Sequence, residues 1–161
     1  MLLLAQFLLL ILCANGTPIL ARQFFKQTFI AKPIDAGKLF VDNRPVLGPS
    51  KTWRGLLASL LLTPLCAIAL GLNMMDGIYI ASLAMFGDIF SSFVKRRLQI
   101  ACSDRAIGLD QIPESLLPMT YAYVQYQLPV TYLIAGLLIF FVLELLLSRI
   151  LYRAGIRKRP Y

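Results

Sequence analysis

Histidine is absent from the 161 residues, and charged side chains make up only 15% of them. The absence of histidine excludes Ser-His-Asp and Cys-His nucleophilic sites and most zinc sites. Cysteine is scarce too, and Cys13, Cys66 and Cys102 show neither a metal-binding spacing nor the even count of a disulfide framework. We interpret them as inert thiols, since Cys behaves as a small hydrophobic residue. Any catalysis must therefore use Asp, Glu, Lys, Arg, Ser and a bound metal ion.

Apolar residues make up 58% of the chain, more than an ordinary soluble domain carries. About twenty apolar residues cross a bilayer core. The sequence therefore predicts an all-α integral membrane protein, with one transmembrane domain over residues 1–161. The five predicted helices are 2–20, 56–72, 78–94, 116–128 and 130–151. The fourth range is the shortest, and a re-entrant segment is the alternative there.

Lysine and arginine gather in three segments of the chain. Seven lie in residues 22–55, four lie in residues 95–115, and the rest follow from Arg149 onward. Lys and Arg in short loops favour the cytoplasmic side. Five crossings with the N-terminus outside satisfy this preference, because they place the two basic loops and the C-terminus inside. We expect a multi-pass protein of the inner (cytoplasmic) membrane. The net charge of +8 does not indicate nucleic acid, since the basic residues sit between long apolar runs.

Asp88 lies inside the third predicted helix, where an ionisable side chain is costly and indicates a functional site. Ser91, Ser92 and Lys95 follow at helical spacing and share its face. This face favours a polar groove for a metal ion and a phosphate. The alternative is a helix-packing stripe next to basic side chains that extend to the lipid headgroups.

Asp110 and Gln111 lie in the second predicted loop. A single loop Asp is usually only solvated, so Asp110 becomes significant as a partner of Asp88. Two carboxylates beside a cluster of cations suit Mg²⁺, which takes oxygen ligands. Paired metal ions can stabilise both the attacking and the leaving oxygen of a phosphoryl transfer.

Residues 50–55 open the second predicted helix, and the preceding Gly-Pro turn predicts a helix cap at Ser50. The free N–H groups of a helix N-terminus favour anions. Lys51 and Arg54 are one turn apart, so both can reach the same phosphate. The alternative is an interfacial belt in which Trp53 lies among the headgroups.

Other polar residues of the first loop and the membrane helices leave their roles open. Asp35 and Asp42 form local ion pairs or hold a nucleotide or metal ion. Asn15 and Pro18, near the cytoplasmic end of the first helix, are candidates to line the same site. Glu144 lies inside the last helix, and its sequence context gives it no specific role.

Taken in order, these motifs resemble the CDP-archaeol synthase family over nearly the whole chain. In the first loop they are Pro33-Ile34-Asp35, Gly37, Leu47-Gly48 and Lys51-Thr52-Trp53-Arg54-Gly55. In and after the third helix they are Gly87-Asp88, Ser92-Phe93, Lys95-Arg96-Arg97-Leu98 and Asp110-Gln111. The segment 92–96 is also similar to the Ser-x-x-Lys-Arg segment of CDP-diacylglycerol synthases.

The resemblance implies a Mg²⁺-dependent transfer of the cytidylyl group from CTP to a membrane lipid phosphate, with release of pyrophosphate. It implies that Asp88 and Asp110 hold the metal ion and act in catalysis together with Lys95. The implied substrate-binding residues are Asn15, Asp35, Lys51, Thr52, Arg54, Ser92, Arg96, Arg97 and Gln111.

The sequence also leaves two other classes of function open: a non-catalytic membrane protein or assembly factor that binds anionic lipid, and a small transporter. The lipid tail, either archaeol-type or phosphatidic-acid-type, is undecided. The oligomeric state is open as well, and includes a homo-oligomer.

Overall fold

The computed structural model describes residues 1–25, 29–102, 104 and 106–155. Within these residues the chain has five α-helices and one short 3₁₀ helix, Phe29–Ala31. The α-helices are α1 (Leu2–Phe24), α2 (Trp53–Ala69), α3 (Met74–Arg97), α4 (Gln111–Gln125) and α5 (Val130–Arg153). The predicted all-α membrane fold with five helices is confirmed. The basic residues Lys26, Arg105, Arg157, Lys158 and Arg159 lie outside the described residues.

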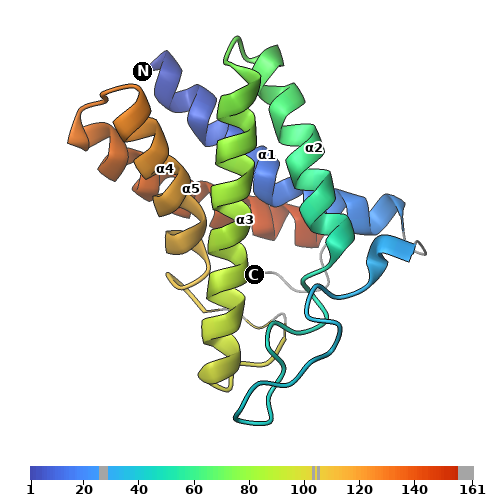
Figure 1. The fold of residues 1–161 in the computed structure, drawn as a ribbon. Helices are drawn as coiled ribbons and strands as arrows, with labels where there is room; N and C mark the ends of the chain where they lie inside the picture. The colour runs from blue at the N-terminus through green and yellow to red at the C-terminus, as the bar shows by residue number, and fades with distance from the viewer. Residues whose placement is uncertain (26–28, 103, 105, 156–161) are drawn as a thin grey trace.

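Three of the described helices, α1, α3 and α5, are long and apolar enough to cross a membrane. Helix α2 is apolar but shorter, with 17 residues. Successive helices alternate in direction, so the N-terminus and the α2–α3 and α4–α5 connections lie at one end of the molecule (Figure 1). The two long loops, between α1 and α2 and between α3 and α4, therefore meet at the other end.

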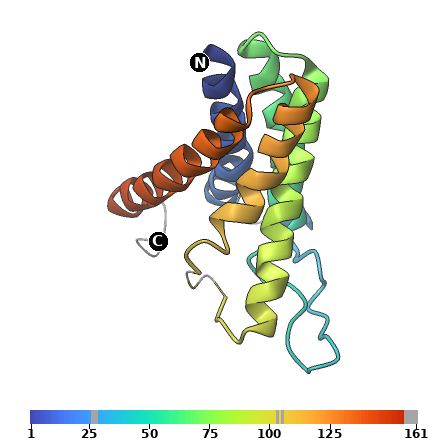
Figure 2. The same cartoon turned by 90° about the vertical axis from the view of Figure 1, so that its left-hand side faces the viewer.

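Helix α5 leans away from the other four helices towards its C-terminal end, as Figure 2 shows. Large apolar side chains that are fully buried form the core between the helices: Phe7, Leu10 and Ile11 of α1, Ile80 of α3, Met119 of α4 and Phe140 of α5. Only 11% of the most apolar stretch of α5 is buried inside the bundle, as expected for a helix that faces lipid.

Helix α4 begins at Gln111, several residues before the predicted start at residue 116. Pro113 falls in its first turn, where a proline is tolerated because its missing N–H would have no helical partner. Gln111 and Glu114 are therefore helical residues, although the prediction placed both in the second loop.

Proline inside α1 brings α1 and α2 close together. Pro18 leaves the carbonyl of Ala14 without its helical N–H partner, and the hydroxyl of Thr17 donates to that carbonyl at 3.3 Å instead. Gly55 of α2 packs against this point, since a Cβ added to Gly55 would lie 3.0 Å from the Cβ of Pro18. The free thiols of Cys13 and Cys66 face each other across the same pair of helices, with sulfur atoms 3.1 Å apart.

A buried carboxylate ties α3 to α4 at the end of the bundle opposite the loops. Asp76, which is 3% exposed, accepts hydrogen bonds from the hydroxyls of Tyr121 at 2.9 Å and Tyr126 at 2.6 Å. Its second oxygen also accepts the backbone N–H of Asn73, so Asp76 closes the N-terminus of α3 as well. Its contacts therefore give Asp76 a structural role, far from the polar end.

Candidate active site

Asp35 organises the loop between α1 and α2. Its carboxylate accepts three backbone N–H groups, from Gly37 at 3.0 Å, Leu47 at 2.9 Å and Gly48 at 2.8 Å. Burial on its own raises the pKa of Asp35, but the three hydrogen bonds to the charged form outweigh it and leave the pKa below the usual value. Asp35 therefore shapes the loop, and it is not among the residues that line the cavity described below.

The stability that Asp35 contributes is expected to depend on pH. A carboxylate whose folded pKa is lowered stabilises the fold above its unfolded pKa, and that stability is lost as the pH falls through the folded pKa. We expect Asp35→Asn to lower the melting temperature at pH 7 by about 2–4 °C, the shift for a loss of about 1 kcal/mol in a chain of this size. Melting curves in detergent at decreasing pH check this, since the gap between wild type and Asp35→Asn should close below about pH 3.8. A difference in melting temperature that stays constant as the pH falls would contradict this prediction.

Arg97 fixes the tip of the first loop against the end of α3. Its guanidinium pairs with Asp42 at 2.7 Å, donates to the carbonyl of Pro45 at 2.6 Å, and lies over the rings of Phe40 and Phe93. These contacts position the loop. Arg97, an implied substrate-binding residue, is not among the residues that line the cavity described below.

Arg96 joins the second loop to the first. It donates to the sulfur of Cys102 at 2.7 Å and to the carbonyl of Ala101 at 3.2 Å. Cys102 in turn packs on Gly48, where an added Cβ would lie only 2.5 Å from its sulfur. Gly48 also has φ +94°, a conformation that favours glycine. Arg96 therefore holds the loops together, and it does not line the cavity.

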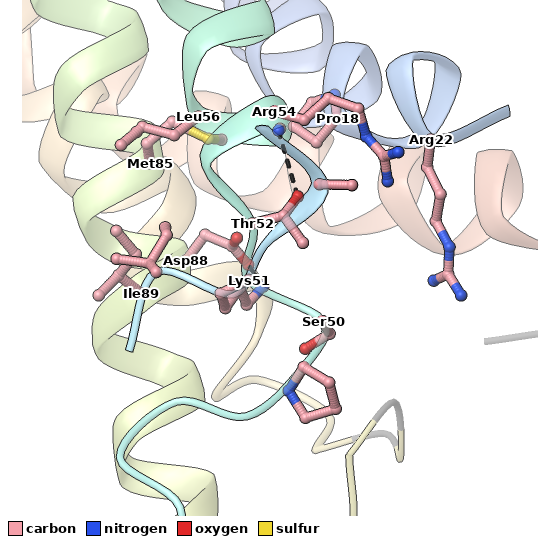
Figure 3. A pocket seen from close by; sticks show the side chains of 14 residues that line it. Pro18, Arg22, Ser50, Lys51, Thr52, Arg54, Leu56, Met85, Asp88 and Ile89 are labelled. Carbon is pink, nitrogen blue, oxygen red and sulfur yellow. Dashed lines mark hydrogen bonds and ion pairs between the residues drawn. The ribbon is translucent and has the colours of Figure 1, made fainter. Parts of the chain in front are cut away.

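The cavity lies between the first loop and the adjoining ends of α1, α2 and α3, and has a volume of ≈ 260 Å³ (Figure 3). The first loop and three helices contribute to its lining: Pro18 and Arg22 from α1, Ile34 and residues 49–52 from the loop, Arg54–Leu56 from α2, and Met85, Asp88 and Ile89 from α3. Thr52 is the N-cap of α2 and accepts the N–H of Gly55 at 3.3 Å, so the predicted cap at Ser50 was wrong by two residues. The positive end of the α2 dipole therefore points into the cavity.

Lys51 and Asp88 form an ion pair in this cavity, joining the first loop to α3. Their side chains remain 18% and 24% exposed, so a ligand can reach both. Burial lowers the pKa of Lys51, but the negative charges of Asp88, Glu114 and Asp110 outweigh it and leave the pKa above the usual value. Lys51 is therefore a cation at neutral pH.

Glu114 is a carboxyl group of this site that the sequence reasoning missed. It lies in the first turn of α4, is 8% exposed, and is close enough to Asp88 for the two carboxyl groups to act on each other. Gly87 makes this contact possible, because an added Cβ would collide with the backbone carbonyl of Pro113. The glycine of the Gly87-Asp88 motif thus lets α4 approach α3 closely enough to bring the two carboxyl groups together.

Gly87→Ala is expected to damage both the stability and the site. The added methyl group must push α4 away from α3, and overpacking of this kind costs about 1–3 kcal/mol. We expect a melting temperature lower by about 2–10 °C and a loss of activity at temperatures where the variant is still folded. Gly16→Ala is the matched control, since Gly16 is also helical and an added Cβ there meets nothing within 4 Å. Equal melting temperatures and activities for the two variants would contradict this account.

A second ion pair lies next to the first. Lys95 of α3 pairs with Asp110 at 2.6 Å, and Asp110 also accepts the N–H of Ala106 at 3.2 Å. Gln111 donates to Glu144 of α5 at 2.6 Å and accepts the N–H of Gly108 at 2.8 Å. Asp110 and Gln111 thus connect the second loop to α3 and α5, and Glu144 has its partner in another helix.

Of the predicted site residues, the structure brings four together around the cavity: Lys51, Thr52, Arg54 and Asp88. The Lys95–Asp110 pair lies close to the Lys51–Asp88 pair. The charge of Lys95 acts on Asp88, and the charge of Asp110 acts on Lys51. Ser92 is buried one turn from Asp88, and the two amide atoms of Asn15, one turn before Pro18, are inaccessible to solvent. Neither is among the residues that line the cavity.

The acidic groups fit a metal ion that arrives with a nucleotide. Mg²⁺ is usually held by one or two carboxylates together with substrate phosphates. Asp88 and Glu114 offer such oxygens, with Asp110 beside them, and all three act on the charge of Lys51. No preformed metal-binding group of three or more Asp, Glu, Cys or His residues occurs in the described part of the chain. The predicted metal ligands Asp88 and Asp110 are each paired with a lysine in this structure.

Comparisons with known proteins agree on one family. The family described as CarS-like, CDP-archaeol synthase, matches residues 2–161. A CDP-archaeol synthase of Pyrobaculum islandicum is 34% identical over 154 residues, which cover 92% of this chain and 91% of the relative. One from Sulfurisphaera tokodaii is 38% identical over 136 residues, with 80% of this chain and 81% of the relative covered.

A solved structure shows a related fold. It is an intramembrane enzyme for the biosynthesis of archaeal membrane lipids, and it superimposes on this chain with a TM-score of 0.74. The two sequences are 30% identical, and the match covers 89% of this chain and 90% of the other. The likeness therefore extends over most of the chain.

Proposed function

This chain belongs to the CDP-archaeol synthase family, and from that membership we propose that the cavity beside the first loop is its active site. The protein is a membrane-embedded, CTP-dependent cytidylyltransferase that makes a CDP-lipid. The observation that supports the site is the Lys51–Asp88 ion pair, which places a cation and a carboxylate in the cavity. Arg54 and the N-terminus of α2 border the same space.

The reaction joins two anions. An oxygen of the lipid phosphate attacks the α-phosphorus of CTP, and the bond from that phosphorus to the oxygen of the leaving pyrophosphate breaks. The lipid phosphate is already a nucleophile, so no Ser or Cys need attack. The barrier comes largely from repulsion between the lipid phosphate and the triphosphate, and fixed positive charges reduce it. Lys51, Arg54 and the positive end of α2 supply such charges.

The carboxyl groups hold these cations in place. Asp88 fixes the ammonium group of Lys51 at the cavity, and Asp110 fixes that of Lys95 nearby. Catalytic power of this kind depends on charges that are oriented before the substrate arrives. When bound, Mg²⁺ would neutralise charge on the triphosphate and orient it, and Asp88, together with either Glu114 or Asp110, would hold the ion.

The cavity lies where water and lipid meet. Lys51 and Asp88 lie at the polar end of the bundle, and Met85, one turn before Asp88 in α3, extends the lining towards the apolar helices. We propose that this end faces the cytoplasm, because it carries the basic loops and Lys and Arg favour that side. CTP then enters from the cytoplasm while the lipid tail stays in the bilayer. The names of the relatives support an archaeol-type lipid phosphate as the substrate.

Removal of the metal ion is expected to stop turnover. We expect purified protein in detergent to release pyrophosphate from CTP in the presence of Mg²⁺ and an archaeol-type lipid phosphate. EDTA should lower this rate by about 10²-fold or more, and excess Mg²⁺ should restore it. ATP in place of CTP is the specificity control. An unchanged rate in EDTA would remove the metal from the proposal, and lipid binding without any pyrophosphate release would favour the non-catalytic alternative.

A further inference from the structure

Arg22 is a cation of the cavity to which the proposed reaction gives no part. It lies in the last turn of α1 and is among the residues that line the cavity. Its side chain is exposed, and within the described part of the chain it makes no ion pair. An arginine presents its N–H donors in a planar fork that suits phosphate. Arg22 is therefore an accessible group that can bind an anion at the edge of the cavity.

Arg54 lies beside the same end of α1. Its guanidinium donates to the backbone carbonyl of Phe25, one turn after Arg22. Because that acceptor is uncharged, it leaves the positive charge of Arg54 uncompensated. Figure 3 shows Arg22 and Arg54 on the side of the cavity away from Asp88. The arginine side of the cavity, formed by Arg22 and Arg54, thus carries two cations that make no ion pair among the described residues.

The other side of the cavity already carries negative charge. Lys51 is paired there with Asp88, and Glu114 lies close to both. These carboxyl groups repel a bare phosphate, whereas a triphosphate with a bound metal ion brings a cation to them. A phosphate without a metal ion is held better by cations that have no carboxylate partner. The electrostatics therefore separate the two substrates, with the triphosphate towards Lys51 and the lipid phosphate towards the arginine side.

The arginine side also lies at the depth expected for a lipid headgroup. Helix α1 is long and apolar enough to cross the membrane, and Arg22 is in its last turn, at the end of the basic loops. Trp53, next to Arg54 at the start of α2, is 46% exposed, and exposed Trp side chains are typical of the headgroup region. Pro18 and Leu56 add apolar side chains to the lining. A lipid phosphate can therefore reach Arg22 while its tails stay in the bilayer.

We propose that Arg22 binds the phosphate of the lipid substrate, with Arg54 between this phosphate and the triphosphate at Lys51. The inference rests on the function proposed above and adds the residue that distinguishes the two anions. Arg22 holds the lipid phosphate both before and during the reaction, so its loss should raise KM for the lipid more than it lowers kcat. A cation in the last turn of a helix also stabilises the helix dipole, and a control must separate that effect.

Kinetics with lipid and CTP varied in turn test the assignment. The variants are Arg22→Met, which removes the cation, and Arg22→Lys, which keeps it. Arg153→Met is the matched control, because Arg153 is an exposed arginine in the last turn of α5 and does not line the cavity. With a dialkylglycerol phosphate in detergent, we expect Arg22→Met to raise KM for the lipid by about 10-fold or more. KM for CTP and kcat should change by less than about twofold.

The controls decide what Arg22 binds. Arg22→Lys should retain most of the affinity for the lipid, and Arg153→Met should behave as wild type. Inhibition by pyrophosphate should be unchanged in Arg22→Met, since pyrophosphate takes the place of the triphosphate. Weaker inhibition by pyrophosphate with an unchanged KM for the lipid would overturn the assignment and place Arg22 at the triphosphate. An unchanged KM for the lipid in Arg22→Met, or an equal rise in Arg153→Met, would overturn it as well.

Binding of the lipid without CTP gives a readout that does not depend on turnover. The dialkylglycerol phosphate should raise the melting temperature of wild type more than the same dialkylglycerol without phosphate does. We expect Arg22→Met to lose this difference and Arg153→Met to keep it. If that pattern appears while wild type releases no pyrophosphate from CTP, the phosphate site at Arg22 stands and the proposed catalysis fails. If pyrophosphate is released and the difference persists in Arg22→Met, the catalysis stands and the site fails.

Discussion

Asp88→Asn is expected to lower kcat on the order of 10³-fold while the protein still inserts and folds. The substitution keeps the size of the side chain but removes the negative charge that pairs with Lys51 in the cavity. Lys51 then loses its fixed position, and the proposed metal ion loses a carboxylate ligand. Both effects act on the transition state, so kcat should fall far more than the affinity for lipid. Pyrophosphate release under saturating CTP and lipid phosphate measures this directly.

Asp76→Asn is the control for general damage from removing a buried carboxylate. Asp76 lies in the same helix at the opposite end, where it accepts hydrogen bonds from Tyr121 and Tyr126. We expect this variant to melt at a lower temperature but to retain most of its kcat at temperatures where it is folded. If Asp88→Asn kept full turnover, or if both variants lost activity equally, Asp88 would have no place in the chemistry.

Lys51→Met is expected to lower kcat/KM for CTP by about 10²-fold or more. Methionine keeps most of the length of the side chain but removes the cation that faces the triphosphate in the proposed reaction. The substitution also leaves Asp88 and Glu114 without their cation, and the two acidic groups then repel the incoming anions. Initial rates at varied CTP concentration separate this effect from a loss of lipid binding.

Lys38→Met provides the matched control. Lys38 is an exposed lysine of the same loop and is not among the residues that line the cavity. Removal of its charge changes the net charge of the protein by the same amount without touching the site. Equal effects of the two substitutions would mean that Lys51 acts only through the overall charge of the loop.

The meeting of the two loops could be predicted from the sequence because charge and length constrain topology. Five apolar runs and basic loops between them require α1–α2 and α3–α4 connections on one side. Asp88 could be singled out from the sequence because a carboxylate is costly in an apolar helix and is seldom found there without a functional role. Its pairing with Lys51 then follows from the fold, since both lie at the same end of the bundle.

The roles of Lys95, Arg96 and Arg97 could not be read from their sequence order. All three belong to α3, which ends at Arg97, and neighbouring helical residues point about 100° apart. They therefore face three directions, towards Asp110, Cys102 and Asp42. A run of basic residues indicates positive charge near a membrane surface. Which of these side chains reaches the cavity depends on the direction in which each one points around the helix.

Glu114 was missed because the start of α4 was predicted too late. With the helix beginning at Gln111, the residue three positions later shares its face and lies against Asp88. The signal was present in Pro113, since a proline in the first turn is typical of a helix start.

A crystal structure of the protein with CTP and Mn²⁺ in place of Mg²⁺ tests the central claim most directly. We predict an anomalous peak about 2 Å from a carboxylate oxygen of Asp88. The triphosphate should lie against Lys51 and Arg54, with the ammonium of Lys51 turned from Asp88 towards a phosphate. A nucleotide bound elsewhere on the protein, with the Lys51–Asp88 ion pair intact and no metal at Asp88, would contradict the account.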